Sequence, residues 1–150
     1  MYPFERFTEK AKKVLTLAQD EAEKYHLSYI DTEQVLLGLL RETDGLAAKV
    51  LAALGFTIEY VRVIVAPLGG TERTKGQQAI PTSRITVVIE MAYEEAKRMH
   101  KTYVGTEHLL LGLLLEDEGA AARMLRKREV TLEKVRHEID FLLNEKGREE

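Results

Sequence analysis

The chain of 150 residues contains no cysteine, which excludes disulfide bonds, thiolate metal sites and a cysteine nucleophile. It also lacks a basic surplus: 22 basic and 25 acidic residues give a formal net charge of −3, so a binder of the phosphate backbone is a poor first hypothesis. The longest apolar run, 109–115, is broken by Gly112 and is too short to span a bilayer. The charged N-terminus has no apolar signal segment. We therefore expect a cytoplasmic protein with no nucleic-acid and no membrane partner.

An internal repeat is the strongest feature of the sequence. Shifting the chain by 74 positions aligns residues 7–68 with 81–142 without a gap, and 24 of the 62 aligned pairs are identical. The longest matching block pairs 29–40 with 103–114. Because chance gives only a handful of identities, we infer a tandem duplication. With 45% of residues hydrophobic and 31% charged, the duplicated chain can form a packed core.

Each repeat has the pattern of four short helices. Apolar residues at helical spacing predict the first helix of repeat one, from Thr8 to Tyr25. Asp31 and Gln34 have the capping-box spacing that starts a second helix, and Gly55 stops the third. Repeat two follows the same order. The predicted helices are at about 8–25, 32–43, 46–54, 57–66, 82–99, 106–115, 120–127 and 131–143.

No stretch shows sustained two-residue alternation, so we expect no sheet. The prediction is an all-α fold: an eight-helix, pseudo-twofold tandem repeat of two four-helix units, fused into a single domain over 1–150 because neither half alone has much core. Repeat one covers about 4–67 and repeat two about 81–144. The segment between them, about 68–80, is rich in glycine and polar residues and predicts a flexible linker, and 145–150 predicts a flexible tail.

Glycine occupies the same place in the most apolar helix of each half, at Gly38 and Gly112. Glycine inside a helix costs roughly 1 kcal/mol relative to alanine. Its presence at both places suggests a close helix approach where the two halves meet. The small pairs 47–48 and 121–122, both Ala-Ala, would serve the same purpose.

Three blocks give the chain a family resemblance. It opens with FTEKAKKVLTLAQDEA, repeat one has Thr-Glu-Gln-Val-Leu-Leu-Gly-Leu-Leu from Thr32, and repeat two has Gly-Thr-Glu-His-Leu-Leu-Leu-Gly-Leu-Leu from Gly105. From about Phe4 to Leu143 the chain resembles the Clp N-terminal domain family, most of all the ClpC type. The resemblance implies a non-catalytic domain that receives substrates or adaptor proteins above the ATPase ring of a Clp protease system. No Walker A loop is present, because Gly76 is followed by glutamine and not lysine, so we expect no nucleotide cofactor.

The resemblance also implies one phosphoarginine pocket per repeat, with Glu33 and Glu107 as the pocket glutamates. Phosphoarginine needs a carboxylate for its guanidinium, and amides at a helix end, hydroxyls or cations for its phosphate. Each repeat has a Thr-Glu pair at the start of its second helix and a threonine at the start of its first, so we expect each repeat to build its own pocket. The candidate binding residues are Glu33, Thr32, Thr8, Glu107, Thr106, Thr82 and Arg84, with Lys10 and Lys12 as further phosphate partners.

A structural alternative applies to each of these residues. An acid in the first helical turn complements the helix dipole without any function. Thr32 and Thr106 suit capping better than ligand binding. Repeat one carries Asp31 where repeat two has glycine and Gln34 where it has histidine, and 83–87 lack the lysines usual in the family. A carboxylate at position 31 repels a dianion, so we expect the two sites to be unequal.

No catalytic set and no metal site emerge from the sequence. His26 and His100 are repeat equivalents near the ends of the first helices and suit helix ends; His108 has no third ligand at a useful spacing, and His137 suits the surface. The basic group 123–128 suits either an acidic partner or a solvated face. Two other functions stay open at this point: a helical regulatory module that binds a partner unrelated to Clp proteolysis, and a small acid–base enzyme, which no residue set supports.

Overall fold

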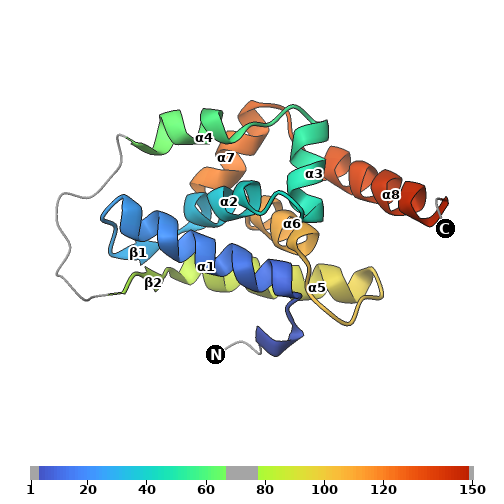
Figure 1. Ribbon diagram of the computed structural model, residues 1–150, viewed down its shortest axis with the longest axis horizontal. Helices are drawn as coiled ribbons and strands as arrows, with labels where there is room; N and C mark the ends of the chain where they lie inside the picture. The colour runs from blue at the N-terminus through green and yellow to red at the C-terminus, as the bar shows by residue number, and fades with distance from the viewer. Residues whose placement is uncertain (1–3, 67–77, 149–150) are drawn as a thin grey trace.

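The computed structural model describes residues 4–66 and 78–148, and in these ranges the chain forms eight α-helices and a short two-stranded ladder (Figure 1). Repeat one consists of the 3-10 turn η1 (Phe4–Arg6), α1 (Glu9–Lys24), β1 (Tyr29–Ile30), α2 (Thr32–Arg41), α3 (Leu46–Ala53) and α4 (Ile58–Val65). Repeat two consists of β2 (Ile80–Pro81), α5 (Ser83–Arg98), α6 (Thr106–Glu116), α7 (Ala120–Lys127) and α8 (Leu132–Arg148).

The predicted eight-helix repeat fold is confirmed, with two differences. Strands were not expected, but β1 and β2 pair in parallel, with Tyr29 opposite Ile80 and Ile30 opposite Pro81. Two residues per strand are too few to give an alternating pattern in the sequence. The tail was expected to leave the helix after Leu143, but α8 continues to Arg148. Of the predicted linker, residues 68–77 lie outside the described ranges.

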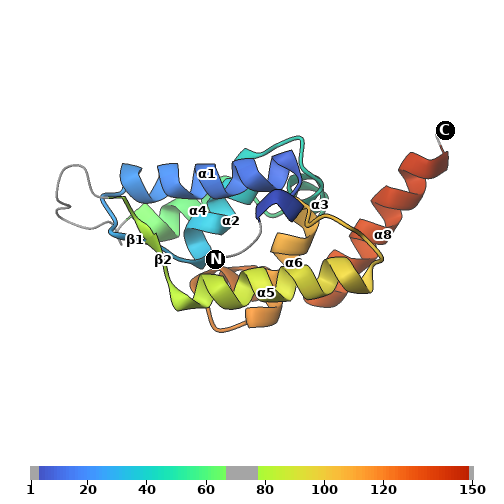
Figure 2. The ribbon, with the colours of Figure 1, turned by 90° about the horizontal axis from the view of Figure 1, so that it is seen from below.

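The two central helices, α2 and α6, contact each other, and each is covered by the first helix of its own repeat (Figure 2). Contacts also cross between the repeats, because α7 packs on α2 and α3 packs on α6 and α8. Fully buried leucines fill the centre, and one core cluster includes residues of both repeats. The central leucines are Leu36, Leu37, Leu39, Leu109, Leu110, Leu111 and Leu113.

The helix glycines do permit a close approach, but not between the halves. A Cβ on Gly38 would lie 2.5 Å from the carbonyl oxygen of Val14, and one on Gly112 would lie 2.5 Å from that of Val88. Val14 and Val88 are on α1 and α5, so each glycine seats the first helix of its own repeat on the second. The predicted contact across the halves was therefore wrong for these two residues.

A buried carboxylate joins the first and fourth helices of each repeat. In repeat one the fully buried Glu21 accepts from Arg62 of α4, at 2.9 and 3.1 Å, and from Arg41 of α2, at 2.9 Å. In repeat two the buried Glu95 accepts from Arg136 of α8 and lies 3.4 Å from Arg98, whose side chain is 70% exposed. The sequence analysis missed these pairs, although both the glutamate and the arginine recur at equivalent positions of the repeats.

The two carboxylates differ in how many partners remain when one arginine is removed. Arg136→Met should destabilise the fold by about 3 kcal/mol, because it leaves Glu95 buried with only an exposed arginine nearby. Arg62→Met should cost less, because Arg41 still donates to Glu21. Urea unfolding of both variants measures the difference. Equal losses, or a larger loss for Arg62→Met, would contradict this account of the pairs.

Candidate functional site

Two short backbone ladders hold the starts of helices from different repeats side by side. The amide of Thr8 donates to the carbonyl of Val104 at 2.9 Å, and the amide of Val104 donates to the carbonyl of Arg6 at 2.8 Å. These bonds set the start of α1 beside the start of α6. In the same way the amide of Thr82 donates to the carbonyl of Ile30 at 3.0 Å and sets the start of α5 beside the start of α2.

The candidate sites are therefore crossed between the repeats. Thr8 of repeat one lies with Glu107 of repeat two, while Thr82 and Arg84 of repeat two lie beside the start of α2, which carries Glu33. The expectation that each repeat builds its own pocket was wrong for the cavity at Glu107, which residues of both repeats line. A local sequence pattern cannot distinguish the two arrangements, because the segments that pair are equivalent in the two repeats.

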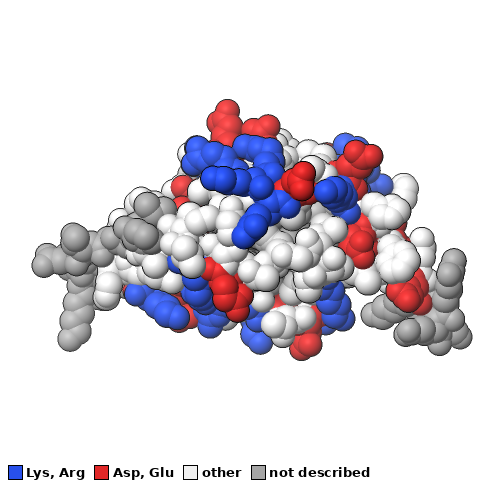
Figure 3. Space-filling model, turned by 90° about the horizontal axis from the view of Figure 1, so that it is seen from above, with Lys and Arg blue, Asp and Glu red and all other residues white. Residues whose placement is uncertain are grey.

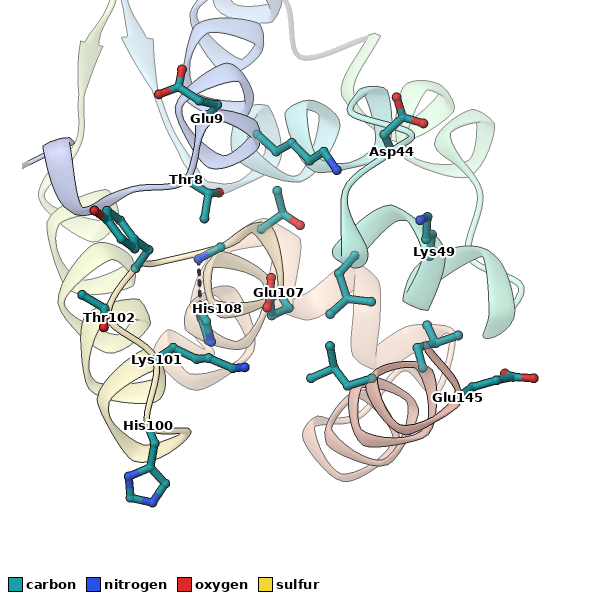
Figure 4. Close-up of a pocket in the computed structure, with 17 residues that line it drawn as sticks. Thr8, Glu9, Asp44, Lys49, His100, Lys101, Thr102, Glu107, His108 and Glu145 are labelled. Carbon is teal, nitrogen blue, oxygen red and sulfur yellow. Dashed lines mark hydrogen bonds between the residues drawn. The ribbon is translucent and has the colours of Figure 1, made fainter. Parts of the chain in front are cut away.

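The larger cavity, here called the Glu107 pocket, has a volume of about 1120 Å³. Figure 4 shows Glu107 at the start of α6, between Thr8 and Lys101. Lysines from three separate elements line this cavity, and Leu46, Leu142 and Leu143 add an apolar part. The lysines are Lys10, Lys49 and Lys101. Besides Glu107, the acids Glu9, Asp44 and Glu145 line the cavity. It thus presents carboxylates as well as cations near the start of α1.

The sequence analysis missed Lys49, Lys101 and the end of α8 as parts of this cavity. They come from α3, from the loop before α6 and from the last helix, and only the tertiary fold brings these elements together. No short-range pattern marks them. The extension of α8 past Leu143 adds Glu145 to the lining.

The loop that enters α6 is held by His108. The amide of Gly105 donates to Nδ1 of His108 at 2.8 Å, just as the amide of Asp31 donates to Oε1 of Gln34 at 2.8 Å in repeat one. Because Nδ1 accepts a hydrogen bond, the neutral ring carries its proton on Nε2, which is buried without a partner among the described residues. Burial is the main cause that lowers the pKa of His108, so the ring stays neutral in the fold.

Stability should therefore depend on the protonation of His108. A histidine whose pKa is lower folded than unfolded binds its proton more readily in the unfolded chain, so the free energy of unfolding falls as pH drops below roughly 6.5. His108→Gln keeps the hydrogen-bond acceptor that repeat one uses and removes this titration. Urea midpoints of the variant should decline less than wild type between about pH 7 and 5. His137→Gln, at an exposed position, is the control; equal slopes for His108→Gln and wild type would contradict the assignment.

The carboxylate of Glu107 folds back over Gly105. A Cβ at position 105 would collide with Oε1 of Glu107, so this placement depends on the glycine. The equivalent position in repeat one is Asp31, which caps α2 by accepting from the amide of Thr32 at 2.8 Å. Glu33 therefore lies in different surroundings, and its Oε1 is buried without a hydrogen-bond partner in the described chain.

A smaller cavity of about 230 Å³, here called the Glu33 pocket, lies beside this carboxylate. Burial is the main cause that raises the pKa of Glu33, and the charge of Asp31 raises it further, while its own backbone amide, Arg84 and Arg123 act to lower it. Arg84 lies 3.5 Å from a carboxylate oxygen of Asp31 and donates through Nε to Glu116 at 3.2 Å. The full lining is Tyr25, Leu27, Tyr29, Glu33, Gln34 and Val65.

The hydroxyls of Thr32 and Thr106 make hydrogen bonds across the interface of the repeats, and Thr106 also lines the Glu107 pocket. The hydroxyl of Thr106 accepts from the amide of Ala47 at 3.0 Å, and that of Thr32 accepts from the amide of Ala121 at 3.1 Å. Both threonines are buried. They cap helices, as the structural alternative expected, but the helices they cap, α3 and α7, belong to the opposite repeat. Thr8 caps its own helix, accepting from the amide of Ala11 at 3.1 Å.

Basic side chains gather on the face that carries α4 and α7 (Figure 3). Four exposed residues of this group come from the end of α7: Arg123, Arg126, Lys127 and Arg128. Arg126 donates to the carbonyl of Asp117 at 2.8 Å, and Arg128 lies 4.2 Å from the ring centroid of Tyr60 on α4. Two of the four therefore contribute contacts to the fold itself.

His26 and His100 end α1 and α5 in the left-handed conformation, with φ of 58° and 59°, as the helix-end interpretation predicted. Within residues 4–66 and 78–148, no three metal-binding side chains come together in a way that could hold an ion. No helix in the same ranges has the length and apolar character needed to cross a bilayer.

The fold is shared with solved structures. The N-terminal domain of the chaperone ClpD from Arabidopsis thaliana matches with a TM-score of 0.72 and 26% sequence identity, covering 95% of this chain and 97% of that one. The ClpV N-domain, solved in complex with a VipB peptide, matches with a TM-score of 0.72, covering 88% of this chain and 83% of that one. At 13% identity, the second likeness shows the fold alone. The doubled helical bundle is thus of the kind found in N-domains of Clp proteins.

Sequence comparison gives the family. The model of the Clp repeat (R) N-terminal domain matches residues 6–128 and 80–149. The negative regulator of genetic competence ClpC/MecB of Bacillus subtilis (strain 168) is 47% identical over 146 residues, which are 96% of this chain and 18% of that protein. The chain belongs to the Clp N-terminal domain family. It spans less than a fifth of the length of the relative it matches.

Proposed function

We propose that this chain is the non-catalytic domain through which a cytoplasmic Clp-type unfoldase receives substrates and adaptor proteins, and that the Glu107 pocket recognises phosphoarginine on marked proteins. The observation that carries the proposal is the crossed geometry, which sets the start of α1 beside Glu107 in one large cavity. Membership of the family supports the role in a Clp system. The ClpV N-domain, which shares the fold, was solved with a bound peptide, which supports peptide binding here.

The Glu107 pocket has the two kinds of group that phosphoarginine requires. The carboxylate of Glu107 suits the guanidinium, which pairs with carboxylates through two parallel N–H donors. The first turn of α1 presents amides without intrahelical partners, and these bind anions. Lys10, Lys49 and Lys101 add positive charge around the same space. The acids Glu9, Asp44 and Glu145 also line it, so the phosphate is assigned to the lysine side near the start of α1. The arrangement binds a zwitterionic side chain and supplies no group for a chemical step.

The Glu33 pocket suits a phosphate less well. Asp31 and Glu116 flank Arg84 and neutralise the cation that corresponds to Lys10 of the other pocket. An incoming dianion meets the negative charge of Asp31 beside Glu33, which repels it. We therefore assign phosphoarginine to the Glu107 pocket first.

Calorimetric titration with a blocked phosphoarginine tests the proposal. Glu107→Gln should weaken binding by about 2 kcal/mol, or roughly thirtyfold, because it removes the charged partner of the guanidinium. Glu33→Gln is the matched control from the equivalent position and should leave most of the heat of binding. The double variant Glu33→Ala/Glu107→Ala should show none. No heat from wild type at millimolar ligand, or equal loss in both single variants, would overturn the assignment.

A further inference from the structure

The two pockets occupy equivalent places in the repeats, so each difference between them changes the ligand they can take. Lys101 lines the Glu107 pocket, while the equivalent residue in the Glu33 pocket is Leu27. Among the described residues, the lining of the Glu33 pocket contains one acid and no basic residue. Its walls are the rings of Tyr25 and Tyr29 with the aliphatic Leu27 and Val65. This composition favours a cation with an apolar stem.

Two of the nearby arginines, Arg84 and Arg62, are already paired with carboxylates, and the third, Arg123, makes no ion pair with Glu33 in the described chain. Arg84 lies between Asp31 and Glu116, and the side chain of Glu116 is 7% exposed. Arg62 reaches the hydroxyl of Tyr25, at 3.3 Å, but both ends of its guanidinium are held by the buried Glu21. Within the described chain, the carboxylate of Glu33 is therefore left without a short ion pair, and its Oε1 is buried without a hydrogen bond.

Glu33 is half-buried, and its carboxylate has one buried oxygen without a hydrogen bond. Leaving that oxygen unpaired is costly, and a cation in the adjoining cavity offsets the cost. A guanidinium suits the cavity better than an ammonium does. It is planar and weakly hydrated, it stacks on aromatic rings, and it pairs with a carboxylate through two donors. Tyr29, which is 49% exposed, lies at the rim, where a side chain entering from solvent would pass.

We propose that the Glu33 pocket binds an unmodified arginine side chain of a client or adaptor protein, with its guanidinium on Glu33 and its methylenes against Tyr29 and Leu27. Together with the proposed function, this site would let the domain bind the same residue in two forms, arginine in the Glu33 pocket and phosphoarginine in the Glu107 pocket. The inference rests on the contents of the Glu33 pocket and does not require that the Glu107 pocket bind phosphoarginine.

The test compares four small ligands on the full chain by calorimetry and NMR titration. These are blocked arginine, blocked lysine, blocked citrulline as the uncharged isostere, and blocked phosphoarginine. Arginine should bind with roughly tenfold or greater preference over citrulline and over lysine. Equal binding of citrulline would show that charge does not drive recognition and would overturn the proposal. Tighter binding of lysine would overturn the choice of arginine, and no binding of arginine at millimolar concentration would remove the site.

Variants then locate the site. Glu33→Gln should abolish arginine binding, while the matched Glu107→Gln should leave it within about twofold. Loss of arginine binding in Glu107→Gln alone would overturn the proposal. If phosphoarginine fails to bind anywhere while arginine binding still depends on Glu33, the proposed function fails and this inference stands. If phosphoarginine binds in a way that depends on Glu107 while arginine binding does not depend on Glu33, only this inference is overturned.

A residue exchange between the pockets provides a second variant that leaves Glu33 in place. Leu27→Lys introduces the cation that the other pocket carries as Lys101, and should weaken arginine binding roughly tenfold or more by occupying the carboxylate. Lys101→Leu is the matched control and should leave arginine binding at the Glu33 pocket unchanged. Circular dichroism and the thermal midpoint confirm that each variant is folded. Undiminished arginine binding in folded Leu27→Lys would contradict the proposal.

Discussion

Two threonine hydroxyls, each capping a helix of the opposite repeat, are the interaction on which the rest of this structure depends. Thr106 accepts from the first turn of α3 and Thr32 from the first turn of α7. A Cβ on Gly45 or Gly119 would lie 2.9 or 2.5 Å from these hydroxyl oxygens, so the glycines permit the approach. Helix ends need partners for their amides, and here each repeat supplies the partner that the other lacks. The two halves consequently form one interlocked domain.

This reciprocity also determines where the pockets lie. Because the halves close on each other, the chain entering α1 pairs with the chain entering α6, and the chain entering α5 pairs with the chain entering α2. The Glu107 pocket therefore combines a carboxylate from repeat two with a helix end from repeat one, whereas the described lining of the Glu33 pocket comes from repeat one. A substitution in one repeat changes a site that both repeats build: Asp31 of repeat one engages Arg84 of repeat two. Divergence between duplicated halves thus gives two pockets of different chemistry in one small domain.

The sequence predicted the positions of the helices better than it predicted which helix starts lie side by side. Helical spacing and caps such as Asp31 located the helices, because these signals act within a few residues. The family motif pointed to Glu33 and Glu107, and each lines a cavity; their role in binding stays a prediction. The pairing of helix starts across the repeats was not predicted. The same local sequence pattern fits helix starts that pair within one repeat and helix starts that pair across the two repeats. The role of Thr106 and the lysine of α3 in the Glu107 pocket depend on contacts between residues more than fifty positions apart. The Glu21–Arg62 pair recurs in repeat two as Glu95–Arg136, and this recurrence is a signal of a long-range contact that the sequence does contain.

The central claim is that the helix starts pair across the repeats, so that both repeats assemble the Glu107 pocket, and nuclear Overhauser effects measure this pairing most directly. The account predicts cross-peaks that link Thr8 with Val104 and Thr82 with Ile30 in the folded chain. Cross-peaks that instead link Thr8 with Ile30 and Thr82 with Val104 would pair the helix starts within each repeat, separate Thr8 from Glu107 and contradict the account.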